Sequence, residues 1–377
     1  MQNGYRAKTL GIGILLTGVL LIILFLLAVT KKEEDIVIGV AWPFSVQNAL
    51  FIEGVELAAE EINARGGING RKVRLIKKDD EETLTGGMIV AQSFTKVPNL
   101  TAVIGHSESF ISTATANIYE SAGIVMLSPT ATASALTQKG HKYIFRNIPS
   151  DDEIARQLAL YAAKQGHRRM VIFYSDESYG MGLANSFEDQ AKKVGIKTVD
   201  RFNYYADARE LNKLCAKWKA LDFDGILVAH YMPADGAQFI ADVVKAGVSV
   251  PFFAGDTMDA PEFFQVAGEA AEGTVVGSVF NSQDPREEVK YFINNFNSKY
   301  GKMPTPEAAQ GYDAVNLLAG AIEEAGSASP AEVAQKLRSF KSRPGVAGFH
   351  SFAENGDDTG DLIVKKVVKN GQFDFID

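Results

Sequence analysis

The chain has 377 residues, of which 46% are hydrophobic and 22% charged, a composition that indicates a folded globular protein and excludes a disordered or fibrous one. The formal net charge is −8 and Lys and Arg form no dense cluster, which argues against a nucleic-acid-binding protein. Cys215 is the single cysteine, so the chain can form neither an internal disulfide nor a thiolate metal cage.

The N-terminal part contains a long apolar segment, residues 10–29, without a charged side chain. At about 1.5 Å per residue, a helix of this length just spans a hydrocarbon core of about 30 Å. Signal-peptide cores are usually shorter, about 7 to 15 residues, and end at a small-x-small cleavage site. Here only Ala28 fits such a site. We therefore expect residues 1–35 to hold a tail and one transmembrane helix, and we favour an uncleaved anchor over a cleaved signal.

From Ile36 onward, apolar runs of strand length alternate with helical patterns, which predicts βαβ units and parallel sheets. The expected strands cover residues 36–41, 72–76, 102–105, 124–127, 170–174, 198–202, 225–229, 251–255, 273–279, 347–352 and 362–368. The expected helices cover residues 47–65, 83–97, 109–122, 152–165, 179–193, 210–220, 238–246, 285–300, 306–325 and 329–340. We therefore predict an α/β protein, and its length allows two domains.

The stretch from Thr101 to Thr132 carries the strongest indication of a ligand site. Its two apolar runs each end in small hydroxyl residues, and a helix that begins at Ser109 lies between them. Ligands of open parallel sheets bind outside the carboxyl ends of the strands. Ser109 is placed to act as N-cap, and a helix N-terminus also favours an anion such as a carboxylate.

Several motifs in order resemble those of a known family: GHSESFISTATANIYESAGIVMLSPTAT (105–132), LTQKGHKYIFR (136–146), EGVELAAEEINARGGINGRKV (53–73), YGMGLANSFEDQAKKVGIK (179–197) and FAENGD (352–357). They look like the branched-chain amino-acid type of periplasmic binding protein, the type I substrate-binding proteins of ABC transporters. The resemblance implies two Rossmann-like lobes joined by three hinge strands. It places the first lobe at 36–150 plus 279–350 and the second at 151–278 plus 351–377, with crossings near Ser150, Val279 and Ser351.

The resemblance also implies a function and a set of ligand residues. The function is the extracytoplasmic capture of an amino acid, or of a similar small amphoteric solute, by closure of the two lobes, with delivery to an ABC permease in the same membrane. Ser109 would hold the ligand carboxylate, the Thr130 carbonyl and the Thr132 hydroxyl would hold the ammonium, and Asp256 would neutralise it. Tyr179 and Tyr231 would close from the second lobe.

Weaker candidates for ligand binding are Glu108, Asp151, Trp42 and Gln47. Glu108 facing the cleft would favour a cationic or polar ligand, and the bulky Trp42 suggests a side-chain pocket that differs from a branched-chain one. Ordinary structural roles compete with the strong candidates, because Ser and Asp are common helix caps and Tyr is common in plain packing. We expect no cofactor, no metal site and no nucleic-acid partner.

Two other functions remain open from the sequence. A membrane-anchored sensor would report ligand occupancy to a partner protein, since fold alone does not fix function. A serine hydrolase is suggested by the stretch 105–109, which approaches a G-x-S-x-G nucleophile elbow around Ser107, with His350 downstream. The final Gly of that motif is replaced by Ser109, which argues against the hydrolase.

Overall fold

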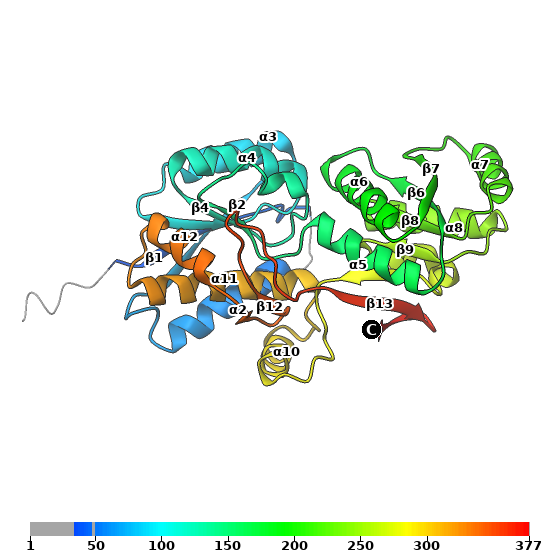
Figure 1. Ribbon diagram of the computed structural model, residues 1–377. Coiled ribbons are helices and arrows are strands. Elements are labelled where there is room, and N and C mark those ends of the chain that lie inside the picture. The colour runs from blue at the N-terminus through cyan, green and yellow to red at the C-terminus, as the bar shows by residue number, and fades with distance from the viewer. Residues whose placement is uncertain (1–33, 47–49, 377) are drawn as a thin grey trace, which may run out of the picture.

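The computed structural model describes residues 34–46 and 50–376, which form two α/β lobes side by side (Figure 1). The two-lobed α/β fold with largely parallel sheets is the one expected. The expected transmembrane helix and Gln47 lie outside the described residues. Within the described ranges, no helix is both long and apolar enough to cross a membrane.

The first lobe contains a five-stranded parallel sheet in the order β2-β1-β3-β4-β5. Every residue of β1 and β3 is buried, because helices cover both faces of the sheet. Its strands are β1 (Ile36–Trp42), β2 (Val73–Asp79), β3 (Leu100–Ile104), β4 (Val125–Ser128) and β5 (Ile144–Arg146). Its helices are α2 (Phe51–Ala64), α3 (Leu84–Phe94), α4 (Ser109–Ala122), α10 (Glu287–Tyr300), α11 (Pro306–Ala325) and α12 (Pro330–Ser339).

Helices α2 and α11 pack closely on one face of this sheet and carry residues far apart in the sequence. Gly54 of α2 lies against the backbone carbonyl of Ala308 in α11, where any Cβ would overlap that oxygen. The absence of a side chain at Gly54 therefore sets how near the two helices come. On the same face, Trp42 at the end of β1 stacks on Phe51 with 3.8 Å between ring centroids.

The second lobe contains a seven-stranded sheet in the order β14-β13-β10-β9-β8-β6-β7. Helices α5 and α6 contribute to the core on one face, and α7, α8 and α9 to the core on the other. Its strands are β6 (Arg169–Tyr174), β7 (Lys197–Phe202), β8 (Gly225–Ala229), β9 (Phe252–Ala254), β10 (Val275–Ser278), β13 (Val364–Lys369) and β14 (Gln372–Ile376). Its helices are α5 (Asp151–Lys164), α6 (Ser178–Lys193), α7 (Ala208–Ala220), α8 (Pro233–Lys245) and α9 (Pro261–Ala267).

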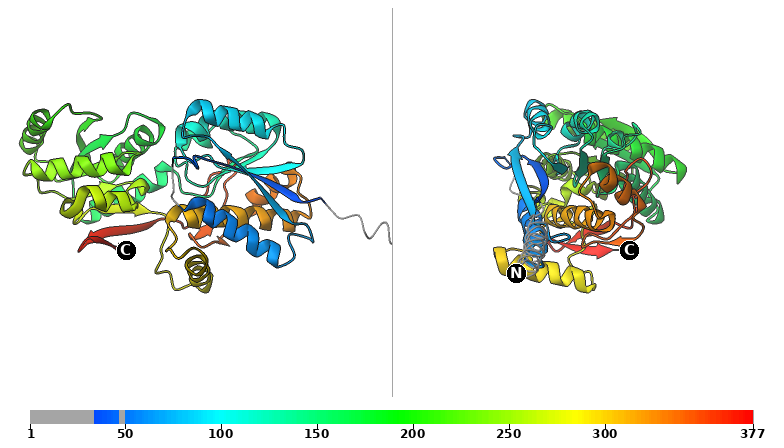
Figure 2. Two further views of the ribbon diagram at one scale, coloured as in Figure 1. Left: turned by 180° about the vertical axis from the view of Figure 1, so that it is seen from behind. Right: turned by 90° about the vertical axis from the view of Figure 1, so that its left-hand side faces the viewer.

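The last two strands depart from the parallel pattern. β13 runs antiparallel to β10, and β14 runs antiparallel to β13. The turn between them consists of Asn370 and Gly371, which both have positive φ, as a two-residue hairpin turn requires. Figure 2 shows this red hairpin on the lobe opposite to the blue strand β1. β14 was not among the expected strands, although Asn-Gly is a hairpin signal.

The chain passes between the sheets after β5, after β10 and before β13. The third passage lies later than expected, because the segment after Ser351 still packs on the first lobe. Phe352 belongs to the core of that lobe and meets Phe145 edge to face, and the N–H of Arg146 donates to the Gly356 carbonyl over 3.2 Å. Of the strand expected at 347–352, only β12 (Phe349–His350) forms, and it pairs with β11 (Arg343–Pro344).

Candidate functional site

Four of the expected ligand residues lie in the first turns of helices where the lobes meet. Ser109 is the first residue of α4, Asp151 the first of α5 and Tyr179 the second of α6, while Asp256 begins a short 3-10 helix, Asp256–Met258, after β9. Helices α4 and α6, from opposite lobes, approach each other at this junction (Figure 1). We call Ser109, Thr130, Thr132, Asp151, Tyr179 and Asp256 the interlobe site.

Ser109 does not cap its helix, contrary to expectation. Glu108 holds the N-cap position and makes no side-chain capping bond. Ser109 is 4% exposed, and its Oγ accepts a hydrogen bond from the N–H of Ala133 over 3.3 Å. The hydroxyl thus links the first turn of α4 to the loop after β4, and the partial positive charge of the helix N-terminus lies beside it.

The loop after β4 presents Thr130 and Thr132. The Thr130 hydroxyl donates to the carbonyl of Ser107 over 2.8 Å. The carbonyl of Thr132 accepts from the N–H of Asp151 over 2.8 Å, whereas its buried hydroxyl has no hydrogen-bond partner. The loop therefore joins the start of α4 on one side and the start of α5 on the other.

Arg146, a residue that the sequence did not single out, holds this loop in place through hydrogen bonds to its backbone. Its guanidinium is completely buried and donates to the carbonyls of Ala131 and Ala133, both over 2.9 Å. Nε lies 2.6 Å from a carboxylate oxygen of Asp357. Burial lowers the pKa of Arg146, and the negative charges of Asp357 and Asp151 oppose that shift.

The Asp256 carboxyl and the Tyr179 hydroxyl form a hydrogen-bonded pair. The Tyr179 hydroxyl donates to Asp256 Oδ1 over 3.0 Å and lies 3.3 Å from Thr257 Oγ1. This approach requires glycine at position 255, because a Cβ there would overlap the Tyr179 hydroxyl. Burial raises the pKa of the Asp256 carboxyl to about 6, although the bond from Tyr179 lowers it in part.

Asp151 is the most buried acid of the interlobe site. Its side chain is completely buried, and neither carboxylate oxygen has a hydrogen-bond partner. Burial raises the pKa of Asp151 well above its usual value. The neighbouring Thr132 hydroxyl lowers this pKa in part, and the negative charge of Asp256 raises it further. Gly182 leaves the room that this carboxyl occupies.

The remaining candidates lie around or outside this group. Tyr231 is partly buried, and its backbone N–H donates to Ser175 Oγ over 3.2 Å. Burial raises the pKa of Tyr231, and the negative charge of Glu108 in the first lobe adds to the shift. Trp42 is 2% exposed and stacked on Phe51 in the core, rather than presented at a ligand surface. Gln47 is outside the described residues.

Glu307 is a further acid with a raised pKa, and nothing in the sequence had drawn attention to it. It is the second residue of α11, after Pro306, where an acid is an ordinary choice near the helix N-terminus. Burial raises the pKa of its carboxyl to about 7, and the negative charges of Asp259 and Asp256 add to the shift.

Residues 35–372 match the periplasmic binding protein family. The chain belongs to that family. This periplasmic binding protein is 28% identical to an amino acid binding protein of Pseudomonas aeruginosa, over 91% of the chain and 93% of the relative. It is 30% identical to a Leu/Ile/Val-binding protein homologue of Brucella abortus, over 86% and 87%. Within the family, it is a solute-binding protein of the branched-chain amino-acid type.

A solved structure agrees with this assignment. An ABC transporter substrate-binding protein from Desulfitobacterium hafniense is 50% identical, with 91% of this chain and all of that chain covered and a TM-score of 0.85. The same protein in complex with Leu has a TM-score of 0.84 and equal coverage.

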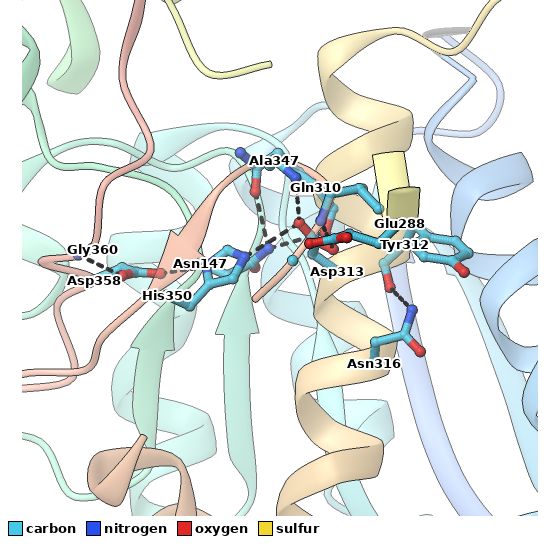
Figure 3. A network of polar contacts seen from close by, with 12 residues as sticks. Asn147, Glu288, Gln310, Tyr312, Asp313, Asn316, Ala347, His350, Asp358 and Gly360 are labelled. Carbon is cyan, nitrogen blue, oxygen red and sulfur yellow. Dashed lines mark hydrogen bonds and ion pairs between the residues drawn. The ribbon is translucent and has the colours of Figure 1, made fainter. Parts of the chain in front are cut away.

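The geometry of this periplasmic binding protein does not assemble the serine hydrolase considered from the sequence. Both ring nitrogens of His350 contact carboxylates, Nδ1 with Asp358 at 2.6 Å and Nε2 with Asp313 at 3.2 Å (Figure 3). The Ser107 hydroxyl donates to Glu108 Oε1 over 3.1 Å. His350 therefore has no free nitrogen with which to accept a proton from Ser107.

A cavity of about 770 Å³ lies on the first lobe and not at the interlobe site. Its lining comes from α2, α11 and the segment around Arg343, and it includes Tyr312 and Asn316. None of the interlobe-site residues lines it. We locate the candidate site by its convergent polar groups, because a site between two lobes depends on how far they are closed.

Proposed function

We propose that this protein is the extracytoplasmic solute-binding protein of an ABC importer, and that it binds an α-amino acid or a similar small amphoteric solute between its lobes. The observation that carries the proposal is that groups suited to the carboxylate and groups suited to the ammonium of an amino acid lie at the same junction of the lobes. The first turn of α4 with Ser109 suits a carboxylate. Asp256, the Thr132 hydroxyl and the Thr130 carbonyl suit an ammonium group.

The mechanism is binding coupled to hinge closure, with no chemical change of the ligand. Ser109, Thr130 and Thr132 belong to the first lobe, whereas Asp256, Tyr179 and Tyr231 belong to the second. A ligand that contacts both sets gains its full interaction energy only in the closed form. It therefore shifts the equilibrium toward closure, which is the form that a permease partner would recognise.

Leucine is the first ligand to test, because the relative that is 50% identical was solved in complex with Leu. The match to the periplasmic binding protein family supports a location outside the cytoplasmic membrane, and the likeness to an ABC transporter substrate-binding protein supports an ABC permease as partner. The apolar segment at residues 10–29 supports a membrane anchor at the N-terminus.

The test is thermal unfolding of the full chain in detergent, freed of bound ligand by denaturation and refolding, against a panel of amino acids, amides and small carboxylates. A ligand at one hundred times its dissociation constant stabilises the folded state by about 2.7 kcal/mol, enough for a clear rise in melting temperature. We expect a rise with one class of amino acid that is lost in Ser109→Ala and Asp256→Ala. A rise only with solutes that lack an ammonium group would contradict the role of Asp256, and no rise across the panel would contradict the proposal.

A further inference from the structure

His106 is a buried titratable side chain that has no part in the proposed binding mechanism. It lies shortly after β3 and is completely buried. Its ring contacts two other buried side chains, with Nδ1 2.6 Å from Asp80 Oδ2 and Nε2 3.1 Å from the Tyr119 hydroxyl. Asp80 directly follows β2, and Tyr119 lies on α4. The ring therefore connects the carboxyl ends of β2 and β3, which lie on either side of β1, with helix α4.

The surroundings of Tyr119 fix the direction of both hydrogen bonds. Burial raises the pKa of Tyr119, and the negative charge of Asp80 adds to the shift, so the phenol keeps its proton. This hydroxyl has no other hydrogen-bond partner among the residues that the structure describes, so it donates to Nε2 of His106. Nδ1 then carries the ring proton and donates it to the Asp80 carboxylate. Asp80 and Tyr119 together fix one tautomer and one orientation of the ring.

Asp80 is itself held in place by the turn that it begins. Its N–H donates to the carbonyl of Trp42, the last residue of β1, over 3.3 Å. Its Oδ1 accepts from the N–H of Glu82 over 3.2 Å, and its carbonyl accepts from the N–H of Thr83 over 3.1 Å. Contacts other than the one with His106 therefore orient this carboxylate, and the bond to Trp42 extends the connection to β1.

The backbone that follows His106 leads into the candidate ligand groups. The His106 carbonyl accepts from the Ser112 hydroxyl of α4 over 3.0 Å. The Ser107 carbonyl accepts from the hydroxyl of Thr130, in the loop after β4, over 2.8 Å. Ser109, the expected contact of the ligand carboxylate, is the first residue of α4. The position of the His106 ring therefore sets the position of the first turn of α4 relative to the loop after β4.

We propose that His106 is a positioning residue of the interlobe site, which holds the first turn of α4 where a ligand carboxylate binds. The inference rests on the proposed function and makes it more specific. A site whose hydrogen-bond donors are already oriented loses less conformational entropy when the ligand binds, and it therefore binds more tightly. Because His106 acts through the backbone that leads to Ser109, its loss should weaken the contact with the ligand carboxylate more than the contact with the ammonium group.

The test compares leucine with leucinamide, which keeps the ammonium group and the branched side chain but has a neutral amide in place of the carboxylate. Binding is measured by titration calorimetry on the full chain in detergent. We expect His106→Asn to weaken leucine binding about tenfold and leucinamide binding much less. His106→Leu should weaken leucine binding further, because the Asn amide can still donate to Asp80 whereas Leu cannot.

A milder pair of variants keeps the test decisive if His106→Leu does not fold. Tyr119→Phe removes one hydroxyl and leaves Nε2 of His106 without its donor. Tyr300→Phe is the matched control, because it removes a hydroxyl of the same lobe that donates to the Glu53 carbonyl over 3.0 Å, away from α4. Both variants should lose stability in urea unfolding, but only Tyr119→Phe should bind leucine more weakly, by about threefold.

Two results would overturn the inference and leave the proposed function standing. One is equal leucine affinity in Tyr119→Phe and Tyr300→Phe, and the other is an equal loss of leucine and leucinamide binding in His106→Asn. A wild-type chain that binds no amino acid would instead contradict the proposed function, and the inference would fail with it.

Discussion

The backbone N–H of Asp151 donates a hydrogen bond to the carbonyl of Thr132 over 2.8 Å, and this bond ties the first turn of α5 to the loop after β4 in the other lobe. The bond holds the Asp151 carboxyl in a buried position without hydrogen-bond partners of its own. An ionised carboxylate in such a place is costly. Ionisation of Asp151 therefore costs the unliganded protein stability.

We predict that Asp151→Asn stabilises the unliganded protein at neutral and alkaline pH. The folded-state pKa of Asp151 is raised by burial, so the stability of the wild type is greatest below the unfolded pKa and falls as the pH rises and the group must ionise. The Asn side chain cannot ionise, so the variant does not lose stability in this way as the pH rises. Urea unfolding at about pH 4 and about pH 8 measures the difference, which should appear only at the higher pH. Asp189→Asn, an exposed residue of α6, is the control, and an equal gain there would contradict the prediction.

We predict that Tyr179→Phe shifts the pH dependence of ligand binding upward. The hydrogen bond from Tyr179 lowers the pKa of Asp256, which burial otherwise raises to about 6. In the wild type, the affinity for an amino acid should fall as the pH drops through this value and Asp256 takes up a proton. Without the hydroxyl, the fall should begin at a higher pH.

Dissociation constants for leucine across about pH 5 to 8 measure this shift. The lost hydrogen bond should also weaken binding by about 0.5–1.5 kcal/mol at neutral pH. Tyr204→Phe, whose ring is highly exposed, is the matched control. The same midpoint in wild type and Tyr179→Phe would show that Asp256 does not govern affinity.

The elements that the sequence predicted best are those whose ends are determined locally. Helices α4 and α11 have the bounds expected for them. Each is followed by a glycine with φ of 65°, at Gly123 and Gly326, a conformation that ends a helix and that side chains resist. Apolar periodicity and a stop signal within a few residues suffice for such elements.

The features that the sequence missed depend on distant contacts. The third crossing was placed too early because Phe352 packs on Phe145, which no local pattern reveals. Ser109 lost its expected capping role because its hydroxyl accepts instead from Ala133, on another loop. The ligand roles of Ser109, Thr132 and Asp256 came from family resemblance and stay predictions, whereas the role of Arg146 emerged only when the structure brought separate segments together.

We predict that Arg146→Met destabilises the fold and disorders the loop after β4. The change leaves the Asp357 carboxylate and the carbonyls of Ala131 and Ala133 without their donor. Breaking a buried ion pair on one side costs about 3–5 kcal/mol. Urea unfolding measures the loss, and Arg156→Met, which removes an exposed ion pair to Glu153, should cost at most about 1 kcal/mol.

A double variant separates the pair from simple loss of packing. Arg146→Met with Asp357→Asn should lose less stability than the sum of the two single changes, because the single changes each leave one charge of the same pair unmatched. Additive losses would show that Asp357 does not act on Arg146. Leucine affinity, measured where each variant is still folded, should fall with Arg146→Met and stay near the wild-type value with Arg156→Met.

We predict that the stability of the first lobe depends on the charge of His350. Its imidazole is completely buried between Asp313 of α11 and Asp358 of the segment before β13 (Figure 3). Burial alone would lower the pKa of His350, but the two carboxylates outweigh it and raise the pKa to about 10. The raised folded-state pKa stabilises the fold fully below the unfolded pKa of about 6.5, and this contribution is lost as the pH rises toward 10.

Melting temperatures between about pH 6 and 10 should therefore fall steadily in the wild type. His350→Gln should be less stable at neutral pH, by several kcal/mol, because Asp313 and Asp358 lose their shared cation and repel each other. Its stability should also vary less with pH in that range. His167→Gln is the control, since His167 is 3.8 Å from Asp224 and partly exposed. A wild-type protein whose stability is flat over this range would show that His350 is neutral, and the acids around it would then have to share a proton.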